Sequence, residues 1–311
     1  MTTSAPTGQR RCAVVYNPTK VSDQFASLLM DRLVKMGWVD TLWLETSAED
    51  PGRGMTQQAV AEHVDLVIAA GGDGTVRIVA DGLAHTGTPM GLIPAGTGNL
   101  LARNLDLPLE EGPAIDVALG GHTRSIDLVR IVVDDRPPEH FAVMAGVGVD
   151  AMIMDETDEN LKEKVGSAAY FVAAGKALGR LPVRMRVQLD DHRPVRRDAM
   201  VCVVGNVGTL RGNLTLIPGA RPDDGLLDLY IASPRKLRHW VKLAWRLIAR
   251  RPQRDDQVDQ HSGKRVVIRI AGTDNYQLDG DVVGESTTLT AEVQPGALKI
   301  CAPAPPGTPG Q

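Results

Sequence analysis

Two glycine-rich turns lie close together in the sequence, and each follows a short apolar run. The first turn is GGDGT at residues 71–75, after the run 66–70, and the second is GTGN at residues 96–99, after the run 90–95. Glycines between a strand and a helix let the backbone approach a ligand closely. Their N–H groups and the helix N-terminus attract anions. Two such turns predict one phosphate-rich ligand held at the edge of one sheet.

Acidic side chains in two places suggest bound cations. Asp73 stands among backbone donors suited to phosphate, where an unpaired carboxylate would repel the ligand. A magnesium ion that bridges carboxylate and phosphate oxygens removes this conflict, and a role as a base is the other chemical possibility. A plain turn residue is the alternative. Residues 221–228 gather further acidic groups, which predict either a hard-cation site of carboxylate and carbonyl oxygens or a solvated turn.

The elements that must position the turns alternate between strand and helix. Apolar runs at 12–16, 41–44 and 66–70 predict strands, residues 24–36 carry apolar side chains at helical spacing, and 55–63 form a shorter expected helix. This alternation is typical of a parallel sheet whose ligands lie at the carboxyl ends of its strands.

The same rule predicts which polar residues meet. Asn17 follows the first expected strand and Thr46 follows the second, and the two glycine turns follow the next two. We therefore expect Asn17, Thr46, residues 71–75 and Thr97 to point to one crevice.

The second half of the chain changes to short β-rich segments separated by Gly, Pro and Asp. The expected strands are 126–133, 184–189, 199–204, 227–232, 265–270 and 287–293. Such punctuation predicts an antiparallel sandwich. We expect a disordered lead at 1–10, an α/β domain at 11–124, a β-rich domain at 125–301 and a disordered tail at 302–311.

Composition argues against several classes of protein. The chain has 311 residues and a net charge of -4, which disfavours a general nucleic-acid binder. Its three cysteines are far apart and odd in number, so they predict no disulfide framework and indicate a reducing cytosol. The first residues lack the apolar core of a signal peptide, and the longest apolar stretch, 141–154, is too short to span a bilayer.

The sequence GGDGT followed by a helix, and then PAGTGN and LARNLDLP, resembles the catalytic domain of the diacylglycerol kinase and sphingosine kinase family in its soluble bacterial form. GGDGT alone is also similar to NAD kinases and, more loosely, to phosphofructokinases, whereas the continuation favours the lipid kinases. The segments 141–151, 166–170, 206–218, 220–228 and 277–281 extend the resemblance. It implies an NAD kinase/phosphofructokinase-like α/β domain followed by a β-sandwich-like domain.

The resemblance implies an ATP site at the carboxyl ends of the first strands. Carried onto this sequence, its residues are Asn17, Thr46, Gly71, Gly72, Asp73, Gly74, Thr75, Val76, Arg77 and Thr97. The family often has asparagine where this chain has Arg77. An arginine there would touch phosphate or cover the helix face.

The resemblance also implies a metal site and a general base. A structural magnesium ion would be held by the side chain of Asp224 and by the carbonyls of Arg221 and Leu226. Asp281 takes the position of a family glutamate, the base that accepts the proton of the lipid hydroxyl.

Asp281 departs from the family pattern, because aspartate is one methylene shorter than glutamate. The difference displaces a base by about 1 Å. Either the backbone shifts to compensate for the shorter side chain, or Asp73 or Asp279 shares the role of base with Asp281. Asp-Gly is also a common turn pair, so an exposed hairpin residue is the plain alternative.

Residues 234–254 form the most basic segment, and most of their apolar side chains fall on one helical face. They predict an amphipathic helix. This helix either packs on the sandwich with its charges in water or leans on anionic lipid headgroups.

These observations predict an ATP- and magnesium-dependent lipid kinase of the cytoplasm, which visits the inner membrane surface and binds no nucleic acid. It would transfer the γ-phosphoryl group of ATP to the hydroxyl of diacylglycerol and give phosphatidate. Sphingosine, ceramide and monoacylglycerol stay open as substrates, because apolar pockets discriminate by only about 1–3 kcal/mol per methylene. The alternatives are a kinase of a soluble substrate such as NAD, and a non-catalytic lipid or nucleotide sensor on the same scaffold.

Overall fold

The computed structural model describes residues 10–148, 181–210, 214–234, 239, 242 and 258–304. The chain divides into two compact units, unit 1 (Met1–Ile126 with Ala297–Gln311) and unit 2 (Asp127–Gly296). The segment 166–170 and nearly all of the expected amphipathic helix at 234–254 lie outside the described residues.

The limits of the units differ from the expected domain limits at both ends. The division falls after residue 126, and residues 297–301 cluster with unit 1, although the sequence placed them in the β-rich domain. Arg10, expected in a disordered lead, is the first residue of β1 (Arg10–Tyr16). The backbone N–H of Ala302, expected in the tail, donates to His122 O (3.0 Å).

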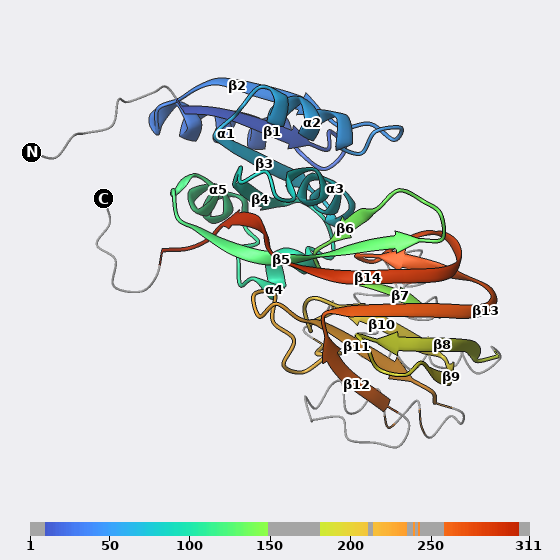
Figure 1. Cartoon of the computed structure of the whole chain (residues 1–311). Helices are drawn as coiled ribbons and strands as arrows, with labels where there is room; N and C mark the ends of the chain where they lie inside the picture. The colour runs from blue at the N-terminus through green and yellow to red at the C-terminus, as the bar shows by residue number, and fades with distance from the viewer. Residues whose placement is uncertain are drawn as a thin grey trace, which may run out of the picture. The chain divides into compact units, whose positions relative to one another are not determined.

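Unit 1 is built on a parallel sheet in the strand order β2-β1-β3-β4 (Figure 1). Its strands are β1, β2 (Trp38–Glu45), β3 (Leu66–Gly71) and β4 (Met90–Pro94). The end of β14 (Asp281–Cys301) adds a further parallel partner, because Ile300 pairs with Met90. The α/β fold with a parallel sheet is therefore confirmed.

Helices cover both faces of this sheet. On one face α1 (Asp23–Lys35) and α5 (Glu111–Leu119) pack on a core that includes Val14 and Ile68. On the other, to which Val15 points, α2 (Arg53–Ala61) packs against α3 (Asp73–Leu83). In the part of the chain that the structure describes, no helix is both long enough and apolar enough to cross a membrane.

Asp50 organises the start of α2. Its Oδ1 accepts from the backbone N–H groups of Gly52 (3.0 Å) and Arg53 (2.7 Å), and its Oδ2 accepts from Gly54 N (2.8 Å). These hydrogen bonds, first of all the one from Gly52, lower the pKa of the Asp50 carboxyl. A side chain upstream of the helix thus satisfies donors that the helix itself cannot.

Unit 2 consists mainly of antiparallel strands. The order is β12-β11-β10-β7-β13-β14, while β8 pairs with β13 and β9, and β5 pairs with β14 and β6. The strand limits are β5 (Thr123–Val133), β6 (Glu139–Phe141), β7 (Met144–Val147), β8 (Val183–Leu189), β9 (Val195–Ala199), β10 (Val201–Gly205), β11 (Leu227–Ala232), β12 (Val258–Gly263) and β13 (Arg265–Leu278). The β-sandwich-like second domain is confirmed.

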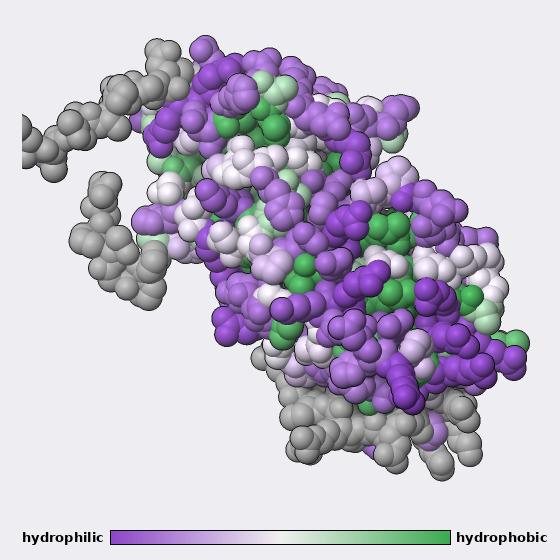
Figure 2. All heavy atoms as spheres, in the orientation of Figure 1, coloured by the Kyte–Doolittle hydropathy of each residue, from purple (hydrophilic) through white to green (hydrophobic). Residues whose placement is uncertain are grey.

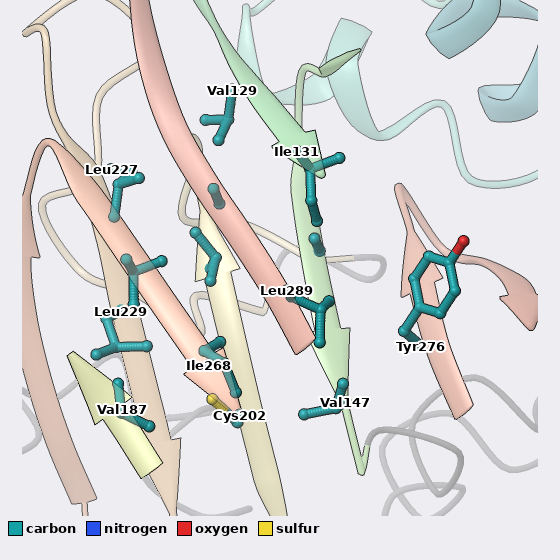
Figure 3. Close-up of a cluster of buried hydrophobic side chains, with 14 of the residues drawn as sticks. Val129, Ile131, Val147, Val187, Cys202, Leu227, Leu229, Ile268, Tyr276 and Leu289 are labelled. Atoms are coloured by element: carbon teal, nitrogen blue, oxygen red, sulfur yellow. The ribbon is translucent and has the colours of Figure 1, made fainter. Parts of the chain in front are cut away.

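The core of unit 2 lies on one side of the strands β8 and β13 (Figure 3). Val187, Ile268 and Leu289 gather there with Cys202 and Leu229 from neighbouring strands. Side chains alternate along a strand, so the residues between the core positions face outward.

All three cysteines are free and buried, Cys12 and Cys301 in unit 1 and Cys202 in unit 2. Burial raises the pKa of Cys202 to about 12 and that of Cys301 to about 11. It also raises the pKa of Cys12, with the nearby Cys301 as a second cause. Thiols in such surroundings stay neutral and unreactive.

Candidate functional site

The residues that follow the strands of unit 1 lie along one edge of its sheet. The backbone N–H groups of Asn17, Thr46 and Ala95 donate to carbonyl oxygens of neighbouring strands at 3.0, 2.9 and 2.9 Å. Each of these residues comes directly after a strand, and the strands are parallel neighbours. The structure thus brings Asn17, Thr46 and both glycine turns to the same edge.

The two glycine turns touch each other. A Cβ atom added to Gly96 would lie 2.7 Å from Gly72 Cα, and one added to Gly71 would lie 2.8 Å from Thr75 Cβ. Neither position has room for a side chain. Within the described residues, no side chain caps α3 at Gly72. A glycine-lined helix N-terminus of this kind is suited to phosphate.

Asp73 joins the two turns. Its Oδ2 accepts from Asn99 N (2.9 Å) and its Oδ1 accepts from Leu100 N (2.6 Å), so the carboxylate caps α4 (Leu100–Asn104). The side chain of Asn99 closes the second turn itself, because it accepts from Gly96 N (2.9 Å) and donates to Gly96 O (2.8 Å). A carboxylate oxygen has two lone pairs, so it is able to accept more than one hydrogen bond.

Sequence reasoning missed this structural role of Asp73 and the part played by Asn99. The signal for Asn99 was its position, because an asparagine between a glycine and an apolar helix is typical of a left-handed turn residue. Its φ of 49° lies in that region. No local signal links Asp73 to the second turn.

The other residues of the expected ATP site differ in exposure. Thr46, Thr75, Val76 and Arg77 are buried, whereas Thr97 is exposed in the second turn. Arg77, at 8% exposure, therefore lies inside the molecule on the first turns of α3. Arginines at such positions are normally paired.

The expected magnesium loop lies in unit 2, just before β11. Asp224 Oδ1 accepts from Leu226 N (3.0 Å), and Arg221 forms an ion pair with Asp223 (Nη2–Oδ1, 3.1 Å). Oxygen donors of these kinds are the ligands that magnesium prefers, so the residues fit a hard cation. No three His, Cys, Asp or Glu side chains gather as a metal site among the described residues. A cation here would therefore depend on backbone carbonyls and water.

The carboxylates of Asp224 and Asp228 lie close enough to influence each other, which is compatible with a bound cation at this loop. Burial, together with the nearby charge of Asp224, raises the pKa of Asp228, although a hydrogen bond from Ser262 Oγ (2.6 Å) opposes the shift. Negative charge that is costly in isolation becomes favourable beside a divalent cation.

Asp127 holds the same loop in place. Its Oδ2 accepts from Gly225 N (2.7 Å), its N–H donates to Pro222 O (2.6 Å), and its Oδ1 accepts from Gly296 N (2.8 Å). Sequence reasoning did not single out Asp127. The signal was a lone acid inside the apolar run 126–133, because a buried carboxylate requires such partners.

Asp281 begins β14 at the tip of a tight hairpin. Asp279 and Gly280 form the turn with φ values of 50° and 100°, and Leu278 pairs with Asp281 across it. Positive φ at both central residues is the type I′ pattern that Asp-Gly favours. The Asp281 side chain is exposed.

Asp279 is buried and bonded to backbone donors. It is 4% exposed, and its carboxylate accepts from the backbone N–H groups of Ala142 (3.2 Å), Val143 (3.0 Å) and Met144 (2.8 Å). A carboxylate held in this way is not placed to take a proton from a substrate. These contacts favour a structural role for Asp279, and its share in the work of a base stays a prediction.

Comparisons with known proteins agree with this architecture. The model of the diacylglycerol kinase catalytic domain matches residues 11–131, and that of the YegS C-terminal NAD kinase beta sandwich-like domain matches residues 143–302. A diacylglycerol kinase of Mycobacterium tuberculosis is 31% identical over 269 residues, which cover 85% of each chain. One of Staphylococcus epidermidis is 33% identical over 249 residues, which cover 76% of each chain.

The solved structures show the same fold. A diacylglycerol kinase crystal structure from Bacillus anthracis str. Sterne matches with a TM-score of 0.71 at 19% identity, over 96% of this chain and 98% of that one. Fold, catalytic-domain match and relatives together define a kinase. The chain belongs to the diacylglycerol kinase family.

Proposed function

We propose that this kinase transfers the γ-phosphoryl group of ATP to the hydroxyl of diacylglycerol and gives phosphatidate, with magnesium. The observation that carries the proposal is the contact between the two glycine turns, locked by Asp73 and Asn99 at the carboxyl edge of the sheet. Two backbone surfaces held this close offer a rigid set of N–H donors. Phosphoryl transfer depends mostly on such positioning and on charge neutralisation.

In this proposal unit 1 binds ATP. The phosphates lie over residues 71–75 and near Thr97, and Asn17 and Thr46 line the same edge. Magnesium would neutralise phosphate charge, with Asp73 accepting hydrogen bonds from its waters. A second, structural magnesium would be held by Asp224 and by loop carbonyls, and it would stiffen that loop.

Asp281 is the proposed base, and its neighbours support a lipid acceptor. Val282 and Val283 directly follow it and are 50% and 40% exposed. An exposed carboxylate beside exposed aliphatic side chains suits a hydroxyl on an apolar molecule. Because that molecule resides in a membrane, the kinase would work from the cytoplasm at the inner membrane surface.

The test is phosphate transfer from labelled ATP with magnesium to diacylglycerol, sphingosine and ceramide in mixed micelles, with NAD as the soluble acceptor. Label in diacylglycerol that is absent without magnesium supports the proposal. Label in another lipid alone would change the substrate, and label in NAD alone would overturn the lipid reaction. Binding of ATP without any transfer would favour a sensor.

A further inference from the structure

Three arginines stand side by side on the outer face of unit 2. In the strand pairing, Arg269 of β13 lies directly opposite Arg186 of β8, and Arg186 lies directly opposite Arg196 of β9. All three side chains are exposed, and their strand neighbours Met185 and Val187 point into the core. We call these three residues the arginine row.

The arginine row is unfavourable for the folded protein by itself. Directly opposite side chains have Cβ atoms about 5 Å apart, and like charges in such pairs repel. No hydrogen bond or ion pair joins the three guanidinium groups to any side chain that the structure describes. Arg197, next in sequence but on the other face, has a carboxylate partner, with Nε 2.6 Å from Asp259 Oδ2.

The surroundings of the arginine row are consistent with a flat, positively charged surface. Arg184 is exposed one position along β8 on the same face, opposite Asp198. Figure 2 shows mainly hydrophilic side chains over the region where Figure 1 places β8, β9 and β13. Just before β8, Leu181 is 89% exposed and offers an apolar side chain beside the charges.

We propose that the outer face of β13, β8 and β9, centred on the arginine row, docks this kinase on a bilayer of anionic phospholipid. Guanidinium groups bind phosphate oxygens in pairs of hydrogen bonds, and lipid phosphates would relieve the repulsion within the row. Leu181 would enter the boundary of the acyl chains, as apolar residues beside basic ones do. The proposal rests on the proposed function, because a membrane-resident substrate is the reason to visit a bilayer.

A bilayer fits this surface better than a nucleic acid does. The whole chain carries a net charge of -4, so its general field disfavours a polyanion that surrounds it. The arginine row crosses three neighbouring strands on one exposed sheet face, so its three charges are able to reach the same planar surface. The arginine row, Thr288 opposite Arg269, and the adjacent pair of Arg184 and Asp198 include no aromatic side chain on which a base could stack.

The experiment measures sedimentation of the full chain with vesicles of phosphatidylcholine, alone or mixed with phosphatidylglycerol. One variant replaces all three arginines of the row with glutamine, and a second replaces them with lysine. A charge-matched control carries Arg11→Gln, Arg32→Gln and Lys35→Gln on unit 1. An oligonucleotide mixture serves as a second polyanion.

Wild type should bind the mixed vesicles, and less so at higher salt. The glutamine variant should bind them about a hundredfold more weakly, since each basic residue near an anionic surface contributes about a fivefold gain. The lysine variant should stay within about tenfold of wild type, because most of the attraction is charge. The glutamine variant should also melt no lower than wild type, because like-charge repulsion is removed.

Equal vesicle binding by wild type and the glutamine variant would overturn the docking surface. Loss of vesicle binding in the unit 1 control would overturn it too, as would tighter binding of wild type to the oligonucleotides than to the vesicles. Turnover of a water-soluble short-chain diacylglycerol separates this inference from the proposed function. Wild type and the glutamine variant should turn over this soluble substrate at equal rates. With diacylglycerol in anionic vesicles, the glutamine variant should be slower than wild type. If vesicle binding depends on the arginine row but wild type turns over no diacylglycerol, the proposed function is overturned and the docking surface is supported.

Discussion

At the scale of single residues, carboxylates that look alike in the sequence have different places in the structure. Asp73 bonds to backbone across 26 and 27 residues of sequence, Asp279 is buried under three backbone donors, and Asp281 is exposed at a hairpin tip. The difference lies in burial and in the partners, since a buried carboxylate needs hydrogen-bond donors around it and an exposed one is solvated by water.

In the proposed reaction, Asp73→Asn should lower transfer activity at least about a hundredfold, because the amide removes a negative charge that would orient magnesium. It should also cost about 1–3 kcal/mol of stability, since an NH2 group would face the N–H of Asn99 or Leu100. Kinase assays and urea unfolding measure both effects. Asp106→Asn, at an exposed position just after α4, is the control and should leave activity and stability unchanged. Full activity in the Asp73 variant would show that Asp73 takes no part in the mechanism.

Asp281→Asn should reduce kcat by about 10²–10⁴-fold without changing the melting temperature, as expected for loss of a general base. Asp281→Glu introduces the side chain that the resemblance implies at this position and should keep activity within about tenfold of wild type. Steady-state kinetics on diacylglycerol provide the readout. Glu285→Gln makes the same charge change on β14 and is the control. Equal activity of the Asn variant and this control would assign the proton transfer elsewhere.

At the scale of elements, turns and helix starts depend on a few close contacts. Gly96→Ala would force a methyl group to within about 3 Å of the first turn, so it should separate the two turns and raise the KM for ATP about tenfold or more. Gly112→Ala on α5 meets nothing within 4 Å and serves as the matched control. An unchanged KM in the Gly96 variant would show that the contact does not shape the nucleotide site.

Asp50→Asn should destabilise the start of α2 by about 1 kcal/mol at neutral pH. The folded-state pKa of Asp50 is lowered below its unfolded value, so its stabilisation is present above about pH 4 and is lost as the pH falls through the folded-state pKa. Thermal unfolding of wild type and variant should therefore differ at pH 7 and converge in acid. Asp31→Asn, exposed on α1, is the control and should stay within about 0.5 kcal/mol of wild type at pH 7. A pH-independent gap between wild type and the Asp50 variant would contradict this account.

The sequence predicted elements well where a pattern is local. The buried run of β3 and the alternation along β8 identify strands from their side chains alone. In contrast, β12 has a polar sequence, VDQHSG, and becomes a strand through pairing with β11. The link from Asp73 to Leu100 is likewise invisible locally, because it depends on which strands become neighbours.

At the scale of the whole molecule, the chain passes from one unit to the other inside strands. β5 crosses the division after residue 126, and β14 crosses back after residue 296. The last residues of β14 then complete unit 1, where Leu298 and Ile300 are fully buried. The stability of unit 1 therefore depends on chain synthesised after unit 2.

Ile300→Ala should cost about 2–5 kcal/mol, the usual range for a large aliphatic side chain removed from a core. Lys299→Ala changes the exposed neighbour and should stay within about 0.5 kcal/mol of wild type. Urea unfolding of the full chain compares the two. Equal stability of both variants would mean that unit 1 holds together without the returning strand.

The rates at which the buried thiols are labelled report on the opening of each unit. Because Cys202 lies in unit 2 and Cys12 and Cys301 lie in unit 1, a thiol reagent gains access to each set only when that unit opens. Pulse labelling followed by peptide mass analysis would therefore time the opening of the two units separately, in the unmodified protein. Addition of ATP should slow the labelling of Cys12 and Cys301, whereas anionic vesicles should slow the labelling of Cys202.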